Sequence, residues 1–314
     1  MKRIVILLEE KWHTESLPDA AAAVRAYQEY GFDTDLWILE EQDRITGEQS
    51  AIPNEPTSDT VTGPNGPHSS ILSPEVADTL FIADSAHLLR QLADAGAAFC
   101  AYSHGGNSGE DLSAAEYILM EPQWVDEDSL VKIWQRQRHL PWSILETERC
   151  LVREFVPDDL DGIYALYDEQ ASRFLEPPSD DRAKEREILC SYIEKMYPLC
   201  GYGHWAVIGK ESGELIGRMG FSFRPAEWAG PEIDACFGYL LRADRRGRGI
   251  TGEVCRALLE YGFMQLGFEV VGADASVFNS ISVKILKSFG FETVAERGDQ
   301  RYYILNKRNW RNRT

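Results

Sequence analysis

Gly238-Tyr239-Leu240-Leu241-Arg242-Ala243-Asp244-Arg245-Arg246-Gly247-Arg248-Gly249-Ile250-Thr251-Gly252 is a run that passes from an apolar segment through a polar turn into closely spaced glycines. An amphipathic segment follows, with apolar side chains at Val254, Leu258 and Phe263. The pattern predicts a strand, a glycine-rich loop and a helix. The first turn of a helix has unpaired backbone N–H groups and a partial positive charge. The run therefore predicts a site for a diphosphate.

Segments on both sides of this run are consistent with one domain. Upstream, 204–208 alternates as a strand, 210–214 is a turn and 215–220 is the returning strand, which together predict a hairpin. Downstream, Asn279-Ser280-Ile281-Ser282 precedes a helix that ends at Phe289-Gly290-Phe291.

The loop 246–251 resembles the coenzyme A loop of the GNAT superfamily of N-acetyltransferases, Arg/Gln-x-x-Gly-x-Gly/Ala. The sixth position departs from that pattern, because it is Thr251 with Gly252 directly after it. No Gly-Lys-Ser/Thr closes the loop as in a P-loop. The opening segment 145–153 and the tail 301–304 also resemble the RimJ/RimL-like branch of that superfamily. The resemblance covers about residues 145–310 and implies an α/β domain over 143–314 with a mixed, mostly antiparallel sheet.

The resemblance also implies a cofactor, acetyl-CoA, and residues that bind it. Leu240 and Leu241 would end the strand 233–241, which supplies N–H groups to the cofactor arm and to the oxyanion of the reaction. The residues expected to cradle the diphosphate are Arg246, Gly247, Arg248, Gly249, Ile250, Thr251 and Gly252. Asn279 and Ser282 match the segment that contacts the pantetheine arm. The alternatives are that the arginines solvate the surface and that Asn279 or Ser280 caps the helix.

The expected reaction is transfer of the acetyl group to a primary amine by direct attack, with a protein N-terminus or a small-molecule amine as acceptor. An alkyl ammonium has a pKa near ~10, so a base or a water chain must remove its proton. Asp234 is the candidate general base, and Glu232 lies on the same side of the strand. Cys236 is less favoured as a nucleophile, and the place of a tyrosine acid in related enzymes falls on Leu286. These gaps leave an alternative, a coenzyme-A-binding regulatory protein without turnover.

Residues 1–142 predict a second α/β domain. Apolar runs that predict strands alternate with amphipathic runs that predict helices, which favours a parallel, Rossmann-like sheet. The expected strands are 3–8, 34–39, 78–84, 97–102 and 117–120, and the expected helices are 16–30, 85–95 and 127–138. Residues 42–76, rich in Pro, Gly, Ser and Thr, predict a long loop.

This N-terminal part weakly resembles haloacid-dehalogenase-like hydrolases. The place of that family's nucleophilic Asp-x-Asp holds Leu8-Glu9-Glu10, so the expectation is a non-catalytic domain rather than a phosphatase. His104, between glycines and a strand end, is either a ligand-lining residue or a loop histidine.

Composition excludes several classes of protein. The net charge is −19, and residues 1–142 hold 24 acidic against 9 basic side chains, which disfavours nucleic acid as a partner. No apolar run approaches the ~20 residues of a membrane span, and the N-terminus is a poor signal peptide. The six cysteines have no metal-ligand spacing, so no metal is expected, and a reducing cytoplasmic location is expected.

Overall fold

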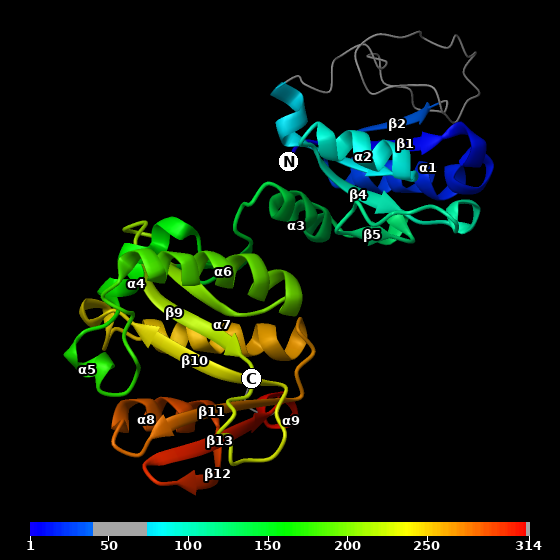
Figure 1. The fold of residues 1–314 in the computed structure, drawn as a ribbon. Helices are drawn as coiled ribbons and strands as arrows, with labels where there is room; N and C mark the ends of the chain where they lie inside the picture. The colour runs from blue at the N-terminus through cyan, green and yellow to red at the C-terminus, as the bar shows by residue number, and fades with distance from the viewer. Residues whose placement is uncertain (40–73, 312–314) are drawn as a thin grey trace. The chain divides into compact units, whose positions relative to one another are not determined.

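The computed structural model describes residues 1–39 and 74–311 (Figure 1). The chain divides into two compact units, Met1–Leu140 and Pro141–Thr314. The boundary expected from the sequence, after residue 142, lies two residues beyond this division. Most of the predicted loop 42–76 falls outside the described residues, and its last three residues belong to the short helix η2 (Pro74–Asp78). None of the described helices is long and apolar enough to cross a bilayer.

The N-terminal unit is built on a parallel five-stranded sheet with strand order β2-β1-β3-β4-β5. Its strands are β1 (Arg3–Glu9), β2 (Asp33–Leu39), β3 (Thr79–Ala83), β4 (Ala98–Tyr102) and β5 (Ile118–Leu119). β3 and β4 are buried along their whole length, as expected of parallel strands covered on both faces. The predicted βαβ sheet is confirmed.

Helices cover both faces of this sheet. α1 (His13–Glu29) and α3 (Glu127–Gln137) pack on one face, and α2 (Ala86–Asp94) packs on the other. The chain runs outward from β1 to β2 and then from β3 to β4 and β5. The direction of winding therefore reverses between β1 and β3, which is the place where open α/β sheets bind ligands.

The C-terminal unit is built on an eight-stranded sheet with strand order β12-β13-β11-β10-β9-β8-β7-β6. Every neighbouring pair is antiparallel except β10 and β11, which confirms the mixed, mostly antiparallel sheet. The strands are β6 (Ser143–Glu146), β7 (Cys150–Arg153), β8 (His204–Gly209), β9 (Leu215–Ser222), β10 (Ala235–Leu241), β11 (Val270–Ser276), β12 (Glu292–Arg297) and β13 (Gln300–Asn306).

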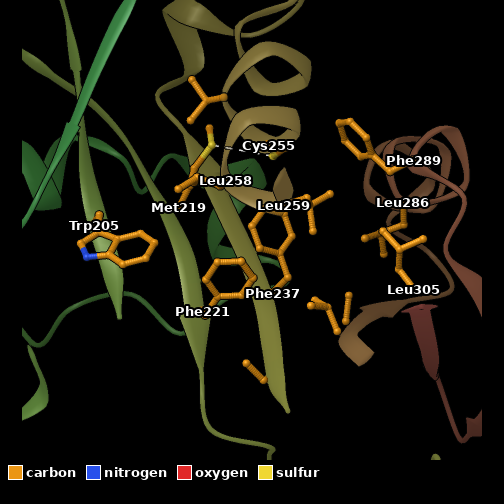
Figure 2. Packing of buried hydrophobic residues seen from close by; sticks show 14 of the residues in the cluster. Trp205, Met219, Phe221, Phe237, Cys255, Leu258, Leu259, Leu286, Phe289 and Leu305 are labelled. Atoms are coloured by element: carbon orange, nitrogen blue, oxygen red, sulfur yellow. Dashed lines mark hydrogen bonds between the residues drawn. The ribbon is translucent and has the colours of Figure 1, made fainter. Parts of the chain in front are cut away.

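Two groups of helices sandwich the middle of this sheet. α7 (Ile250–Met264), α8 (Ser280–Phe289) and α9 (Lys307–Arg311) contribute to the larger core. Figure 2 shows Phe221 and Phe237 of the sheet facing Leu258 and Leu259 of α7. Buried residues of α4 (Leu160–Ala165), α5 (Glu169–Ser172) and α6 (Arg182–Cys200) form a second cluster with the sheet.

Candidate active site

The glycine-rich loop adopts the conformation that the sequence predicts. Gly247 and Gly249 have φ angles of 74° and 79°, in the left-handed region that glycine adopts without strain. α7 begins directly after Gly249, and the first intrahelical bond runs from the amide of Glu253 to the carbonyl of Gly249. The amides of Ile250, Thr251 and Gly252 precede that bond and are therefore donors without an intrahelical acceptor. The start of α7 is thus suited to an anion.

The loop arginines differ in what they contact. Arg246 donates to both carboxylate oxygens of Asp168, at 2.8 and 3.0 Å, and its Nε donates to the carbonyl of Leu241 at 2.9 Å. This hydrogen bonding holds the pKa of Asp168 below its usual range. Arg246 therefore anchors the loop, and its charge is largely compensated. Arg248 has no carboxylate partner within the described part of the chain, so its cation is available to a phosphate.

Arg149 is a residue of this site that the sequence did not single out. It lies in the turn between β6 and β7, and its Nη1 donates to the carbonyl of Arg248 at 2.8 Å. Its Nε donates to Glu253 of α7 at 2.7 Å, and a Cβ placed at Gly249 would lie 3.6 Å from its Nη2. Arg149 therefore braces the loop and brings a second guanidinium beside it. Loop and turn are about a hundred residues apart in sequence, so local pattern carried no signal for this contact.

β10 and β11 separate soon after they begin to pair. Their parallel register has only two partners, Ala235 with Val271 and Cys236 with Gly272, although both strands continue beyond them. Further along, the amide of Arg242 donates to β9. Because backbone groups alternate in direction along a strand, Leu241 faces the opposite side, toward the opening, and its carbonyl there accepts from Arg246.

The predicted residues Leu240 and Leu241 therefore have different surroundings. The side chain of Leu240 lies in the core beside α4 and α6, and that of Leu241 lies in the core beside α7. By the same alternation, the backbone of Tyr239 also faces the opening between β10 and β11. The end of β10 thus presents backbone groups that this sheet does not use.

The far side of the opening is the start of α8. Asn279 is the N-cap, and its Oδ1 accepts the amide of Ser282 at 3.1 Å, so the predicted capping role is confirmed. The hydroxyl of Tyr239 donates to the carbonyl of Ser282 at 3.2 Å and so connects β10 to α8. Leu286, which stands at the place of a tyrosine acid in related enzymes, is buried in the core.

The candidate base Asp234 lies just before β10, next to the short stretch in which β10 and β11 still pair. Its Oδ2 accepts the amides of Glu269 and Val270, both at 2.8 Å, and these bonds hold the start of β11. Cys236 is buried, and burial together with the nearby Asp274 raises the pKa of its thiol to about 12. The thiol is therefore protonated near neutral pH, which disfavours it as a nucleophile.

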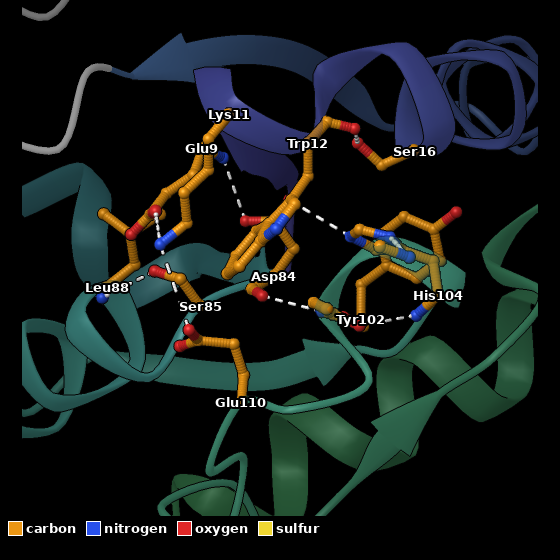
Figure 3. A network of polar contacts seen from close by, with 12 residues as sticks. Glu9, Lys11, Trp12, Ser16, Asp84, Ser85, Leu88, Tyr102, His104 and Glu110 are labelled. Carbon is orange, nitrogen blue, oxygen red and sulfur yellow. Dashed lines mark hydrogen bonds and ion pairs between the residues drawn. The ribbon is translucent and has the colours of Figure 1, made fainter.

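The N-terminal unit holds a separate polar network at the carboxyl ends of its strands (Figure 3). Asp84, fully buried, accepts the amide of Glu9 at 2.9 Å, and burial raises its pKa to about 7. His104 lies 3.4 Å from Asp84 through Nε2, and its Nδ1 accepts the amide of Gly106. Glu9, at the place of the hydrolase nucleophile, pairs with Lys11 at 2.8 Å. The half-buried His104 therefore has polar partners and is not a free loop side chain, and its reading as a ligand-lining residue stays a prediction.

No cluster of three metal-ligating side chains exists within residues 1–39 and 74–311. The expectation that no metal is required concerns the whole chain and stays a prediction.

Comparison with known proteins shows what the C-terminal unit is similar to. Residues 149–292 match the acetyltransferase (GNAT) domain family. The uncharacterized N-acetyltransferase YoaA of Bacillus subtilis is 25% identical over 152 residues, which cover 48% of this chain and 84% of that protein. The uncharacterized N-acetyltransferase p20 of Bacillus licheniformis is 27% identical over 150 residues, with coverage of 47% and 82%.

A solved acetyltransferase from Agrobacterium tumefaciens aligns with 24% identity and a TM-score of 0.43, covering 52% of this chain and 94% of its own. The RimJ/RimL-like branch and the haloacid-dehalogenase-like N-terminal unit stay predictions. Residues 149–292 are thus similar to the acetyltransferase (GNAT) domain, and the sheet with its one parallel pair agrees with that match. The protein is an enzyme of the acyltransferase class.

Proposed function

We propose that the protein is an N-acetyltransferase that moves an acetyl group from acetyl-CoA to a primary amine. The observation that carries this proposal is the glycine loop at the start of α7, immediately beside the opening between β10 and β11. A diphosphate at the loop would lead the rest of the cofactor into that opening. The family match favours this enzyme over a regulatory protein that binds coenzyme A without turnover.

The residues present fit coenzyme A in charge and in hydrogen bonding. The amides of Ile250, Thr251 and Gly252 would donate to the diphosphate, and Arg248 would contribute positive charge. Gly247 and Gly249 shape the loop, and a Cβ at Gly249 would lie 3.6 Å from the Arg149 guanidinium beside it. Arg246 would act indirectly, by holding the loop against the end of β10.

The opening supplies the groups that acetyl transfer needs. The bound thioester supplies an electrophilic acyl carbon. The backbone amides of Tyr239 and Leu241 would donate to the carbonyl oxygen of the acyl group, on which negative charge develops during attack. Asn279 and Ser282, at the start of α8, would flank the pantetheine arm. In the proposed arrangement, the phosphates of the cofactor lie at the start of α7, and its acyl group lies further along the opening, toward Cys236.

The test is binding of coenzyme A by the intact chain and by Gly249→Asp. Coenzyme A should raise the melting temperature of the wild type, because a ligand that binds only the folded protein stabilises it. Gly249→Asp should abolish this rise, since the carboxylate would lie in the cradle and repel the diphosphate.

The matched control is Gly213→Asp, in the turn between β8 and β9. Gly213 has a φ of 68°, and a Cβ there would meet no atom within 4 Å. Both variants thus place aspartate in the left-handed region, and only one affects the loop. Equal coenzyme A binding by Gly249→Asp and wild type would show that the loop is not the phosphate site.

A further inference from the structure

The polar network of the N-terminal unit lies where the winding of its sheet reverses. β1 ends at Glu9, and β3 ends directly before Asp84. Open α/β sheets bind ligands in the crevice outside such strand ends. Both carboxyl side chains are nearly removed from solvent, since 4% of Glu9 and none of Asp84 is exposed. Two buried acidic groups thus stand at the position where this fold favours a ligand.

Two buried polar atoms of this network have no hydrogen-bond partner among the described residues, namely Oε2 of Glu9 and the hydroxyl of Tyr102. Tyr102 ends β4 and is fully buried, and its ring packs on His104 with centroids 5.0 Å apart. Burial, followed by the carboxylates of Asp19 and Asp84, raises the pKa of the Tyr102 hydroxyl to about 12. This hydroxyl therefore lies within electrostatic range of the acidic groups. Buried polar atoms without a partner are rare in native proteins and indicate a water, an ion or a ligand.

Lys11 lies on the solvent side of this network. Its Nζ is 2.8 Å from Oε2 of Glu9, 3.9 Å from Oε1 of Glu110 and 4.1 Å from the centroid of the Trp12 ring (Figure 3). The contact with Glu9 is ionic, because its atoms are not aligned as a hydrogen bond. The lysine side chain is 43% exposed, so its ammonium can move into water at small cost. The structure thus already places an ammonium group between two carboxylates and an indole face.

A second buried carboxylate of the same sheet shows how this chain satisfies such a group permanently. Asp35 of β2 is 8% exposed and accepts the Nε of Arg3 at 3.0 Å, and the Nη2 of Arg3 donates to it as well. The arginine is 20% exposed and contacts the carboxylate with hydrogen bonds. Glu9 is more deeply buried, yet its partner is a half-exposed lysine without that alignment. The contrast favours an exchangeable partner at Glu9 over a permanent one.

The charges at this edge of the sheet favour a cation as that partner. Glu9, Asp84 and Glu110 bring three carboxyl groups, and Lys11 is the cation that contacts two of them. His104 adds no positive charge near neutral pH, because burial lowers the pKa of its imidazole. A phosphate or carboxylate ligand would be repelled by the buried acidic groups, whereas an ammonium is attracted to them.

We propose that Glu9, Trp12, Asp84 and Glu110 form a binding site for a small organic ammonium ligand, whose charged group takes the place of the Lys11 ammonium. We call these four side chains the ammonium site. A primary ammonium has three N–H donors, and Oε2 of Glu9, Oδ2 of Asp84 and the Trp12 ring face are available to receive them. Oδ2 of Asp84 has only a long contact with His104, at 3.4 Å. The exchange keeps the buried carboxylates compensated and gives Glu9 the hydrogen bond that its Oε2 lacks.

The experiment measures binding of n-butylammonium, which copies the lysine side chain, to the intact chain at constant ionic strength. Acetyl-CoA is left out, so the result does not depend on acetyl transfer. Calorimetry gives the affinity, and hydrogen exchange of peptides that cover β1 and residues 103–110 locates the ligand. n-Butylammonium should slow exchange in these peptides, because a bound ligand stabilises the folded state. The neutral analogue 1-butanol and magnesium chloride, at the same concentration, should not.

Variants test the individual side chains. Lys11→Ala removes the internal competitor and should bind n-butylammonium roughly tenfold more tightly than the wild type, whereas Glu9→Gln and Glu110→Gln should each bind it roughly tenfold more weakly. Lys2→Ala is the matched control, because Lys2 pairs with Asp78 at the opposite end of β1, and its affinity should equal that of the wild type.

Several results would overturn the proposal. Binding to Lys11→Ala without binding to the wild type would show that the network is only an internal ion pair. Protection confined to peptides of the C-terminal unit, or equal binding of 1-butanol, would place the amine elsewhere or make its charge irrelevant. Protection by magnesium and not by the amine would indicate a metal site instead. Glu110 is 26% exposed, so a folded Glu110→Gln with unchanged affinity would also refute the site, even where Glu9→Gln fails to fold.

Discussion

Asp84 should make the stability of the N-terminal unit depend on pH. Asp84→Asn should be less stable than the wild type at low pH and equally or more stable at high pH. The carboxyl group is fully buried, and its pKa is raised from 3.8 to about 7, chiefly by burial. A group whose pKa is higher in the folded state binds more protons when folded. The wild type should therefore lose stability as the pH rises from about 4 to about 7.

The size of this effect follows from the shift. A pKa raised by about three units corresponds to a loss of at most about 4 kcal/mol in the free energy of unfolding as the pH rises. Asparagine has no charge to bury, so Asp84→Asn avoids this loss. Both oxygens of the Asp84 carboxyl group can accept a hydrogen bond in either protonation state, whereas the amide nitrogen of asparagine cannot. Asp84→Asn therefore loses the contact with either the Glu9 amide or His104, which costs about 1–3 kcal/mol. The variant should be the less stable protein at pH 4.5 and the equal or more stable one at pH 8.

The assay is hydrogen exchange of peptides from β1 and β3 in the intact chain, corrected for the intrinsic pH dependence of exchange. Protection in these strands reports opening of the N-terminal unit alone. His104 contributes in the opposite direction, because burial lowers its pKa, so its share of stability rises with pH toward 6.5. The quantity to compare is therefore the difference in protection of β1 and β3 between wild type and Asp84→Asn at each pH. Parallel curves from pH 4.5 to pH 8, with no convergence, would refute the reasoning.

Two further outcomes test the unit boundary and the loop. A fragment 141–314 should fold, bind coenzyme A and melt at a higher temperature than 143–314. The shorter fragment lacks Trp142, whose amide donates to the side chain of the buried Glu154 and whose carbonyl accepts the Glu154 amide. Equal melting temperatures of the two fragments would contradict this. Arg149→Ala should weaken coenzyme A binding roughly tenfold, about 1.4 kcal/mol, in a calorimetric titration, and unchanged affinity would exclude its bracing role.

Local pattern was sufficient to predict the glycine-rich loop. The conformation of Gly247 and Gly249, the start of α7 and the cap of α8 each depend on a few adjacent residues, so their chemistry is visible in the sequence. The same holds for the parallel sheet of the N-terminal unit, whose apolar runs need no partner to be recognised. The helix predicted to begin at Ser16 begins instead at His13, because the hydroxyl of Ser16 donates to the Trp12 carbonyl and does not cap the helix.

Contacts between distant segments were not predictable in this way. Arg149 reaches the loop from a turn that precedes it by about a hundred residues, and Arg246 is bound by Asp168 of a separate short helix. Both contacts depend on how strands and helices assemble, and no local periodicity encodes them. They change the interpretation of the arginines, because Arg246 holds the loop, whereas Arg248 has no carboxylate partner among the described residues.

The position at which β10 and β11 separate has the same non-local origin and the largest consequence for chemistry. Asp234, near the start of the predicted strand 233–241, and Asp274, in the next strand, are both acidic residues with apolar neighbours in the sequence. Pairing stops after Cys236, and this alone puts Asp234 among satisfied backbone amides and Asp274 in the opening. Register thus decides which carboxylate holds the backbone of the sheet, and register is a property of the assembled sheet.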